Sequence, residues 1–237
     1  MNELIINKDD LVHNINIIKN YEKEENYTIF AVVKGNAYGL GVNEFTKVLI
    51  DNGINNFAVA SSTEAINLRK NMKEKILLLT PYINEEILSN LIKNDITLTI
   101  DSVKGAGLIN EISKKLNKKV YAHIKIDTGL SRYGFDYKNY KEIINMIKEN
   151  ENIIFEGIYS HFSNSLASDN SFSNIQYERL INVIEKIEKE KITFKYKHIC
   201  NSSGFFKYKD KHLNAARVGS AFSGCATGIQ TDFKKIG

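Results

Sequence analysis

The chain has 237 residues, 43% of them hydrophobic, which is enough to bury a sizeable core in one or two domains. Lysine and arginine outnumber aspartate and glutamate by only 32 to 28, and the lysines are dispersed, so a nucleic-acid partner is not expected. The two cysteines match neither a disulfide framework nor a zinc site, and no signal peptide or membrane-length apolar run is present, so we expect a cytoplasmic protein with neither a metal nor a membrane partner.

The first residues differ in pattern from the rest of the chain. Glu3–Ile6 is typical of a short strand, and Leu11–Tyr21 is typical of an amphipathic helix. Neither belongs to the repeat that follows. We therefore expect this opening stretch to serve something outside the main fold.

Downstream, short apolar runs alternate with amphipathic stretches of about ten or more residues, the pattern of a parallel βα sheet. Eight runs predict strands, at Ile29–Val33, Phe57–Ala60, Ile76–Leu79, Ile96–Ile100, Val120–Ile126, Ile154–Ser160, Phe194–Ile199 and Leu213–Val218. Six stretches between them predict helices, at Asn43–Asp51, Thr63–Lys70, Asn84–Lys93, Val103–Leu116, Tyr137–Lys148 and Asn174–Lys189. Small capping and acidic residues at Thr63-Glu64, Asn84 and Asp101-Ser102 indicate helix starts.

Eight alternations in a chain of this length predict an α/β fold, a (β/α)8 TIM-type barrel, with an open doubly wound sheet as the competing arrangement. A single proline and no low-complexity linker predict one domain over residues 1–237. In such barrels the active site forms where the carboxyl ends of the strands meet the following loops. Polar residues at these ends are therefore the candidates for chemistry.

The first predicted strand leads into Ala31–Gly41, where Lys34 stands between an apolar run and a glycine-rich turn. A lysine at the mouth of a barrel suits Schiff-base chemistry, which requires a neutral amine. The alternative is a lysine that only extends from the rim into water. The glycines match neither a P-loop nor a dinucleotide fingerprint.

Polar groups recur after four later strands, in the segments Lys125–Phe135, His161-Phe162, Asn201-Ser202 and Arg217–Ser220. Small residues in the last two allow hydroxyls and backbone N–H groups to approach an anion, as in the phosphate sites that barrels form after strands seven and eight. Simpler interpretations stay open residue by residue. His161 is also compatible with a satisfied core histidine, Asn201 with a helix cap, and Arg217 with an ion pair to Asp210.

Taken together and in this order, the segments resemble the N-terminal barrel domain of the alanine racemases, the fold-type III enzymes that depend on pyridoxal 5′-phosphate. Glu3–Asn14 also resembles the family's first strand and helix. The resemblance implies pyridoxal phosphate as cofactor, held by Lys34 as a Schiff base, with Lys34 as one of two racemisation bases. It further implies that the phosphate binds Tyr38, Ser202 and the backbone of Gly219 and Ser220, with Asn201 in the same cofactor-binding segment.

The resemblance implies roles for four more residues. His161 packs against the cofactor ring, and Arg217 donates to the pyridine nitrogen. Because an arginine keeps its proton, that nitrogen is expected to stay neutral, which discourages side reactions such as transamination. Arg132 helps to hold the substrate site, and Lys125 falls where some members carry a carbamylated lysine.

Two positions depart from the family pattern, since Ser131 stands where glycine is usual and Leu40 where histidine is common. Ser131 lies on the substrate side, so alanine is a less secure expectation than racemisation as the reaction class. A larger departure is expected after Gly237, because family members continue into a β-rich domain. That domain supplies a tyrosine, the second base, across a head-to-tail dimer.

We therefore expect the cofactor-binding barrel of an amino-acid racemase that interconverts L- and D-alanine for cell-wall precursors. Its expected partners are a small amino-acid substrate and either a second copy of the chain, as a homodimer, or the missing domain. One alternative is a non-catalytic pyridoxal-phosphate homeostasis protein of the single-domain barrel type. Another is a racemase for serine, lysine or ornithine, which differs only in the pocket.

Overall fold

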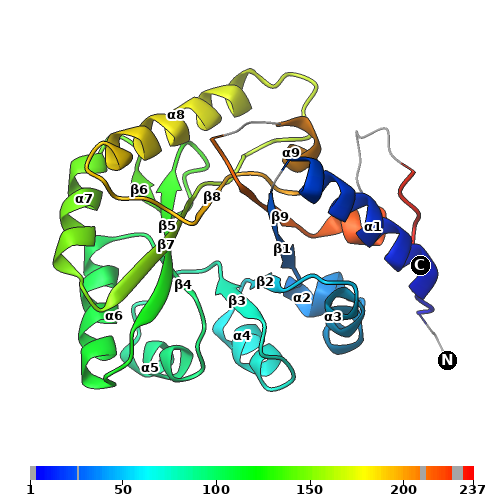
Figure 1. Ribbon diagram of the computed structural model, residues 1–237, viewed down its shortest axis with the longest axis horizontal. Coiled ribbons are helices and arrows are strands. Elements are labelled where there is room, and N and C mark those ends of the chain that lie inside the picture. Colours follow the sequence, from blue (N-terminus) through cyan, green and yellow to red (C-terminus); the bar gives the residue numbers. More distant parts are fainter. Residues whose placement is uncertain (1–3, 26, 209–211, 226–231) are drawn as a thin grey trace.

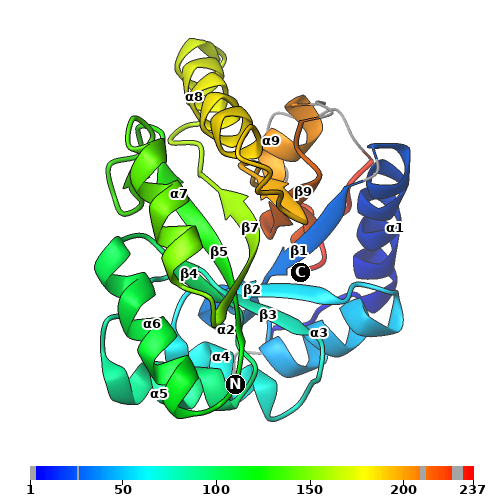
Figure 2. The same ribbon diagram turned by 60° about the vertical axis from the view of Figure 1, so that its left-hand side comes forward.

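The computed structural model of the chain describes residues 4–25, 27–208, 212–225 and 232–237. Within these ranges eight parallel strands stand side by side and helices cover their outer face (Figures 1 and 2). The barrel strands are β1 (Thr28–Val32), β2 (Asn56–Val59), β3 (Lys75–Leu78), β4 (Leu98–Ile100), β5 (Val120–Asp127), β7 (Ile153–Tyr159), β8 (Tyr196–His198) and β9 (Ala215–Val218). The short β6 (Phe135–Asp136) pairs with the end of β5.

Hydrogen bonds close the strands into a ring. The eight strands form two sheets, with the strand orders β3-β2-β1-β9 and β4-β5-β7-β8. They are joined on one side by the Leu78 N–H, which donates to the Thr97 carbonyl at 2.9 Å, and on the other by the Arg217 N–H, which donates to the Cys200 carbonyl at 2.9 Å. The predicted (β/α)8 barrel is confirmed, and the open doubly wound sheet is excluded.

The outer helices follow their strands as the periodicity predicts, with ends that differ by a few residues. They are α3 (Val42–Asp51), α4 (Ser62–Arg69), α5 (Glu85–Lys93), α6 (Val103–Lys115), α7 (Tyr140–Glu149) and α8 (Ser171–Glu188). Asn84 and Ser102 cap α5 and α6 at the predicted starts. In α4 the cap is Ser61, which forms a reciprocal capping box with Glu64.

Two short helices, α2 (Lys34–Tyr38) and α9 (Ser202–Lys207), and the 3-10 turn η1 (Ser220–Ser223) were not predicted. Each is about one turn long or little more, so its sequence shows no helical period. All three directly follow barrel strands. They therefore shape the mouth of the barrel rather than its outer wall.

The N-terminal helix α1 (Lys8–Glu25) corrects two expectations. It packs against η1 and α3, and Tyr21 contacts the aromatic ring of Phe206 after β8, so α1 fills the helix position between β9 and β1. The buried Asn14 fixes it by donating to the Phe222 carbonyl at 3.0 Å and the Lys234 carbonyl at 2.7 Å. The helix is thus part of the barrel. The described residues 4–6 form no strand, although Asn7 just after them donates its N–H to the Ile236 carbonyl at 2.7 Å, and Glu3 lies outside the described residues.

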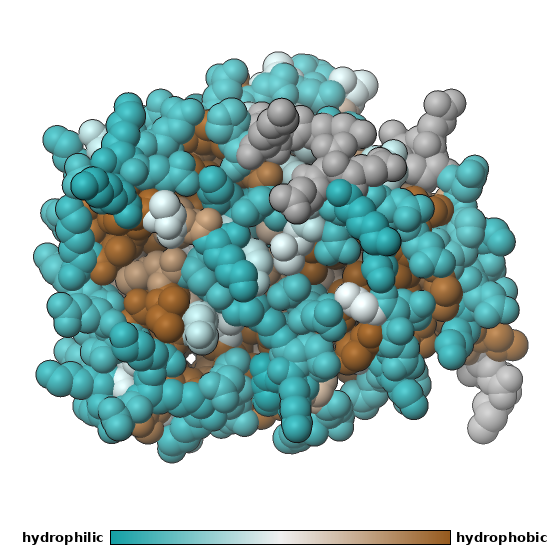
Figure 3. Space-filling model, viewed as in Figure 1, coloured by the Kyte–Doolittle hydropathy of each residue, from teal (hydrophilic) through white to brown (hydrophobic). Residues whose placement is uncertain are grey.

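The space between strands and helices is apolar, whereas the barrel interior is mixed. Phe30, Ala58 and Leu77 point inward, but so do the buried His123 and His198. The exterior is largely hydrophilic on the face drawn in Figure 3, with hydrophobic atoms in scattered areas. No helix in the described ranges is long and apolar enough to cross a membrane.

Candidate functional site

A cavity of about 470 Å³ lies at the carboxyl ends of the strands. It brings together the ten residues for which the sequence predicted a role in the site, although they come from five separate segments. They are Lys34, Tyr38, Lys125, Arg132, His161, Asn201, Ser202, Arg217, Gly219 and Ser220. The structure thus places the ten in one site, while their roles remain expectations.

Lys34 reaches this cavity from an unusual turn. Gly35, Asn36 and Ala37 have φ between 55° and 60°, and Tyr38 has φ 59°, so four successive residues are left-handed. Each L-residue in this conformation costs roughly 1–2 kcal/mol, so the turn needs support from its surroundings. Lys34 itself is exposed, at the rim of the cavity.

Glu64 supplies part of that support. Its Oε1 accepts the Gly35 N–H at 2.6 Å, and its Oε2 accepts the N–H groups of Ala60 at 2.9 Å and Ser61 at 3.0 Å. Burial works to raise the pKa of Glu64, but these hydrogen bonds outweigh burial, so the pKa is lowered and the carboxylate stays charged. One side chain therefore ties the turn after β1 to the start of α4.

Arg217 forms the floor of the cavity and is 3% exposed. Its guanidinium donates to the Ser160 carbonyl at 2.8 Å, to the Ile199 carbonyl at 3.2 Å and to Nδ1 of His161 at 3.0 Å. It also donates to His198, and within the described chain it donates to no carboxylate. Burial lowers the pKa of Arg217 to about 10, which leaves the group cationic at neutral pH, with no counter-ion among the described residues.

His161 is neutral in this setting. Burial, followed by the charges of Arg217 and Lys125, lowers its pKa to about 2. Because its Nδ1 accepts from Arg217, the ring proton resides on Nε2. An uncharged ring beside the cavity is compatible with stacking against a flat ligand as well as with a core histidine.

Lys125 is 2% exposed, and its ammonium donates to the Ile126 carbonyl at 2.9 Å. Burial and then the charge of Arg217 lower its pKa to about 7, so a substantial fraction of the amine is neutral near pH 7. Arg132 is exposed and lies over the Tyr133 ring at 4.9 Å. Ser131 has φ 58°, which gives a physical reason why glycine suits that position.

The loops after β8 and β9 form a second wall of small polar groups. Ser202 Oγ accepts the Gly219 N–H at 3.0 Å. A Cβ on Gly219 would lie 2.4 Å from Tyr38 Oη, so the absence of a side chain there lets the tyrosine approach the wall. Asn201 Oδ1 accepts the Gly204 N–H at 2.9 Å and the Ser165 hydroxyl at 2.8 Å, so its oxygen serves as a helix cap. Asp210, the alternative partner of Arg217, lies outside the described residues.

Several residues of the site were not assigned roles from the sequence. Glu64 is one, and Tyr159, His123 and His198 on the barrel interior are others. A signal was available, because Tyr121, His123, Lys125 and Asp127 alternate along β5, and a period of two places these polar side chains on one face of the strand. For Glu64 the signal was the capping box, but nothing in the sequence connects it to Gly35.

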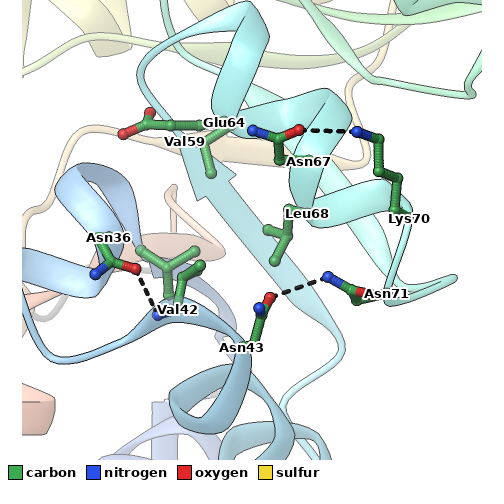
Figure 4. A pocket seen from close by; sticks show the side chains of 10 residues that line it. Asn36, Val42, Asn43, Val59, Glu64, Asn67, Leu68, Lys70 and Asn71 are labelled. Carbon is green, nitrogen blue, oxygen red and sulfur yellow. Dashed lines mark hydrogen bonds between the residues drawn. The ribbon is translucent and has the colours of Figure 1, made fainter.

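A second cavity, of about 430 Å³, lies behind the Lys34 turn, between α3 and α4 (Figure 4). Amide pairs border it, with Asn71 donating to Asn43 at 3.0 Å and Asn36 accepting the Val42 N–H at 2.9 Å. The acid on its wall, Glu64, already accepts three backbone hydrogen bonds. This second cavity is thus similar in volume to the Lys34 cavity, but its described lining offers no comparable set of reactive side chains.

Residues 6–227 match the family model described as alanine racemase, N-terminal domain. Among curated relatives, the alanine racemase of Methanococcus maripaludis is 40% identical over 192 residues, covering 81% of this chain and 52% of the relative. Alanine racemase 1 of Caldanaerobacter subterraneus is 36% identical over 214 residues, covering 89% and 54% respectively. The chain thus spans about half the length of these relatives.

The fold has solved counterparts as well. A structure of the Clostridium difficile 630 alanine racemase in complex with cycloserine superimposes with a TM-score of 0.90 at 33% identity, covering 98% of this chain and 64% of that one. The Bacillus anthracis alanine racemase with bound L-Ala-P superimposes with a TM-score of 0.88, and at 24% identity it supports the fold alone.

Proposed function

Because the chain belongs to the alanine racemase family, matching its N-terminal domain over residues 6–227, we propose that it is the cofactor-binding barrel of a pyridoxal-phosphate-dependent amino-acid racemase. The observation that carries the proposal is the pairing of Lys34 at the rim with the buried, cationic Arg217 on the floor of one cavity. A buried arginine that faces no carboxylate in the described part of the chain is costly unless a ligand acceptor faces it.

The residues present fit pyridoxal 5′-phosphate. Tyr38, Ser202, Ser220 and the bare backbone of Gly219 offer hydroxyl and N–H donors to a phosphate on one wall, with Asn201 holding the turn that carries Ser202. Arg217 offers a donor to a ring nitrogen. When bound, the cofactor supplies an electron-withdrawing ring that stabilises negative charge at the substrate Cα.

The chain's own groups would divide the remaining work. Lys34 would hold the cofactor covalently and move a proton at one face of Cα, and His161 would pack beside the ring. Arg217 would retain its proton because a pKa of about 10 lies far above that of a pyridine, which limits the delocalisation of charge and favours return of the proton to Cα.

On the substrate side, Arg132 would help to bind the carboxylate of a small amino acid. The buried amine of Lys125, with a pKa of about 7, is neutral often enough to react with carbon dioxide, which supports it as a site of carbamylation. A carbamate would carry a negative charge beside Arg132. Alanine is the substrate we propose, since the relatives above are alanine racemases.

Inversion at Cα needs a proton donor on each face. We propose that the second donor is the family's tyrosine, supplied from a C-terminal domain or a second copy of the chain. The barrel alone would then exchange the Cα hydrogen of one alanine enantiomer with solvent while racemising it poorly.

The experiment is a cofactor titration followed by borohydride reduction and peptide mass mapping. We expect visible absorbance of the bound cofactor and an adduct on Lys34 in the native chain, and no adduct in Lys34→Ala. The exposed Lys114, in the last turn of α6, gives the matched control Lys114→Ala, which should retain the adduct. An adduct that persists in Lys34→Ala would refute the assignment.

Incubating the loaded chain with each alanine enantiomer in deuterated water then tests the reaction class. Deuterium at Cα of one enantiomer supports a racemase barrel. A firmly bound cofactor with no exchange in either enantiomer would instead favour the non-catalytic homeostasis protein, and exchange with serine, lysine or ornithine alone would change the substrate.

A further inference from the structure

A line of buried polar side chains runs through the barrel from Arg217 to the opposite end. Nδ1 of His198 contacts the Arg217 guanidinium, and Nε2 of His198 lies 2.9 Å from Nδ1 of His123. Nε2 of His123 lies 3.7 Å from Oε1 of Glu156, which is paired with Lys75. Lys75 is the first residue of β3, so the line ends far from the Lys34 cavity.

The chemistry of the donors gives this line a direction. Arg217 can only donate, so Nδ1 of His198 must accept and its proton must reside on Nε2. That proton is donated to Nδ1 of His123, which places the His123 proton on Nε2. Both rings are fully buried, and burial lowers the pKa of each, so both are neutral and each has one fixed tautomer.

The last proton of the line, on Nε2 of His123, faces Glu156. Nε2 of His123 is buried with no hydrogen-bond partner in the described chain, and 3.7 Å is too long for a hydrogen bond. The main interaction of the Nε2–H group is therefore electrostatic, with the nearby Glu156 side chain. Burial works to raise the pKa of Glu156, but its contacts with His123 and Lys75 outweigh burial and keep it ionised, so a carboxylate faces the His123 N–H.

The backbone is shaped to put Glu156 there. The register of β5 against β7 shifts between Ala122 and His123, which leaves Glu156 as an extra, bulged residue. The next residue, Gly157, lies against His123 so closely that a Cβ would be 2.5 Å from Nδ1 of the ring. A bulge and a bare backbone position together admit the ring and aim the carboxylate inward.

We propose that Glu156 is a positioning residue: Arg217 sets the tautomers of His198 and His123 from the cavity end, and the Glu156 carboxylate stabilises the same tautomers from the opposite end, which holds Arg217 in its orientation toward the cavity. Lys75 balances the carboxylate from the end of the barrel that is partly open to solvent, where its side chain is 22% exposed. The tautomers belong to the cofactor-free chain. The effect on the cofactor's ring nitrogen rests on the proposed function.

Imidazole ¹⁵N NMR on the cofactor-free chain tests the tautomers, since protonated and unprotonated ring nitrogens differ widely in chemical shift. The five histidines are few enough to assign by single substitution. We expect both His123 and His198 as neutral rings protonated on Nε2. A proton on Nδ1 of either ring, or a cationic ring at neutral pH, would overturn the proposal without any variant.

Glu156→Gln tests the cause. Without the carboxylate, Lys75 faces His123 unopposed and favours a lone pair on Nε2, so we expect the Nδ1–H tautomer of His123 to become populated and the His198 signals to shift. The matched control is Glu188→Gln, which neutralises the acid paired with Lys197 at 3.1 Å outside the barrel interior. The control should leave both rings unchanged, and unchanged rings in Glu156→Gln would also overturn the proposal.

Lys75→Met gives a second, opposite perturbation if Glu156→Gln does not fold. Removing the cation leaves the carboxylate unopposed, so the pKa of His123 should rise, and no rise would count against the proposal. Loading each variant with pyridoxal phosphate separates the two hypotheses. Altered tautomers with a cofactor spectrum or affinity that differs from the native chain support both. Altered tautomers in the variants, with no cofactor binding even by the native chain, reject only the proposed function. Unchanged tautomers with a bound cofactor reject only the role of Glu156.

Discussion

Replacing Gly219 with alanine tests whether Tyr38 and the wall after β9 form one phosphate site. The new Cβ would lie 2.4 Å from Tyr38 Oη and 3.0 Å from its ring, which is closer than real side chains approach. Tyr38 is 50% exposed, so its ring can swing into solvent at little cost to the free energy of unfolding. The hydroxyl then moves away from the cavity.

The expected cost falls on cofactor affinity. A hydrogen bond to a charged group contributes about 1.5–3 kcal/mol, which corresponds to roughly 10- to 100-fold weaker binding when it is lost. Fluorescence or absorbance titration with pyridoxal phosphate measures this change, and thermal unfolding of the cofactor-free chain should show a small change. Tyr38→Phe, which removes the hydroxyl and keeps the ring, should weaken binding by a similar factor.

The double variant decides the cause. If Gly219→Ala acts through the Tyr38 hydroxyl, its effect should largely disappear in the Tyr38→Phe background, because coupled residues give non-additive changes. Gly107→Ala is the control, since a Cβ there meets nothing within 4 Å. Equal losses from Gly219→Ala in both backgrounds would refute the reasoning and leave the backbone of Gly219 itself as the binding group.

Three further predictions concern stability. Gly157→Ala should lower the free energy of unfolding by about 1–3 kcal/mol or more, because the buried His123 ring cannot move away from the new Cβ. The control Gly107→Ala should be neutral or stabilising by about 0.5–1 kcal/mol. Urea unfolding compares the two variants, and equal stability would mean that the His123 ring does move. The pKa of Lys125 in the fold is about 7, below the 10.5 of a free lysine, so the unfolded chain binds more protons between these pH values. The stability of the native chain relative to Lys125→Met should therefore rise with pH from about 7 to about 10, by at most about 5 kcal/mol. A flat difference in urea unfolding across this range would contradict the lowered pKa. Glu64→Gln should lower the free energy of unfolding by about 1–2 kcal/mol, because the amide accepts the backbone N–H groups less strongly than the carboxylate does. Since the pKa of Glu64 is lowered in the fold, the extra stability of the native chain should be lost as the pH falls below about 4.5. Thermal unfolding at pH 7 and pH 3 measures this difference, and a difference that is undiminished at pH 3 would argue against a charged Glu64.

The strands, most of the helices and ten of the residues that line the cavity could be predicted from the amino-acid sequence alone. Apolar runs separated by amphipathic stretches have no stable arrangement other than a covered parallel sheet, and parallel strands bring their carboxyl ends to one side. Lys34, His161 and Arg217 could therefore be placed at one mouth from the sequence, because Lys34 and His161 directly follow predicted strands and Arg217 is the second-to-last residue of another.

How these residues are held depends on contacts between parts of the chain that lie far apart in sequence. The position of α1 depends on contacts of Asn14 with residues more than 200 positions away, and no local pattern encodes such a contact. The left-handed turn after Lys34 is locally unfavourable, so propensity argues against it, and Glu64 supports it from another βα unit. The protonation of His198 and His123 likewise depends on which donor faces which acceptor inside the barrel. Those side-chain directions are set by the strand register and by the bulge at Glu156, not by residue type.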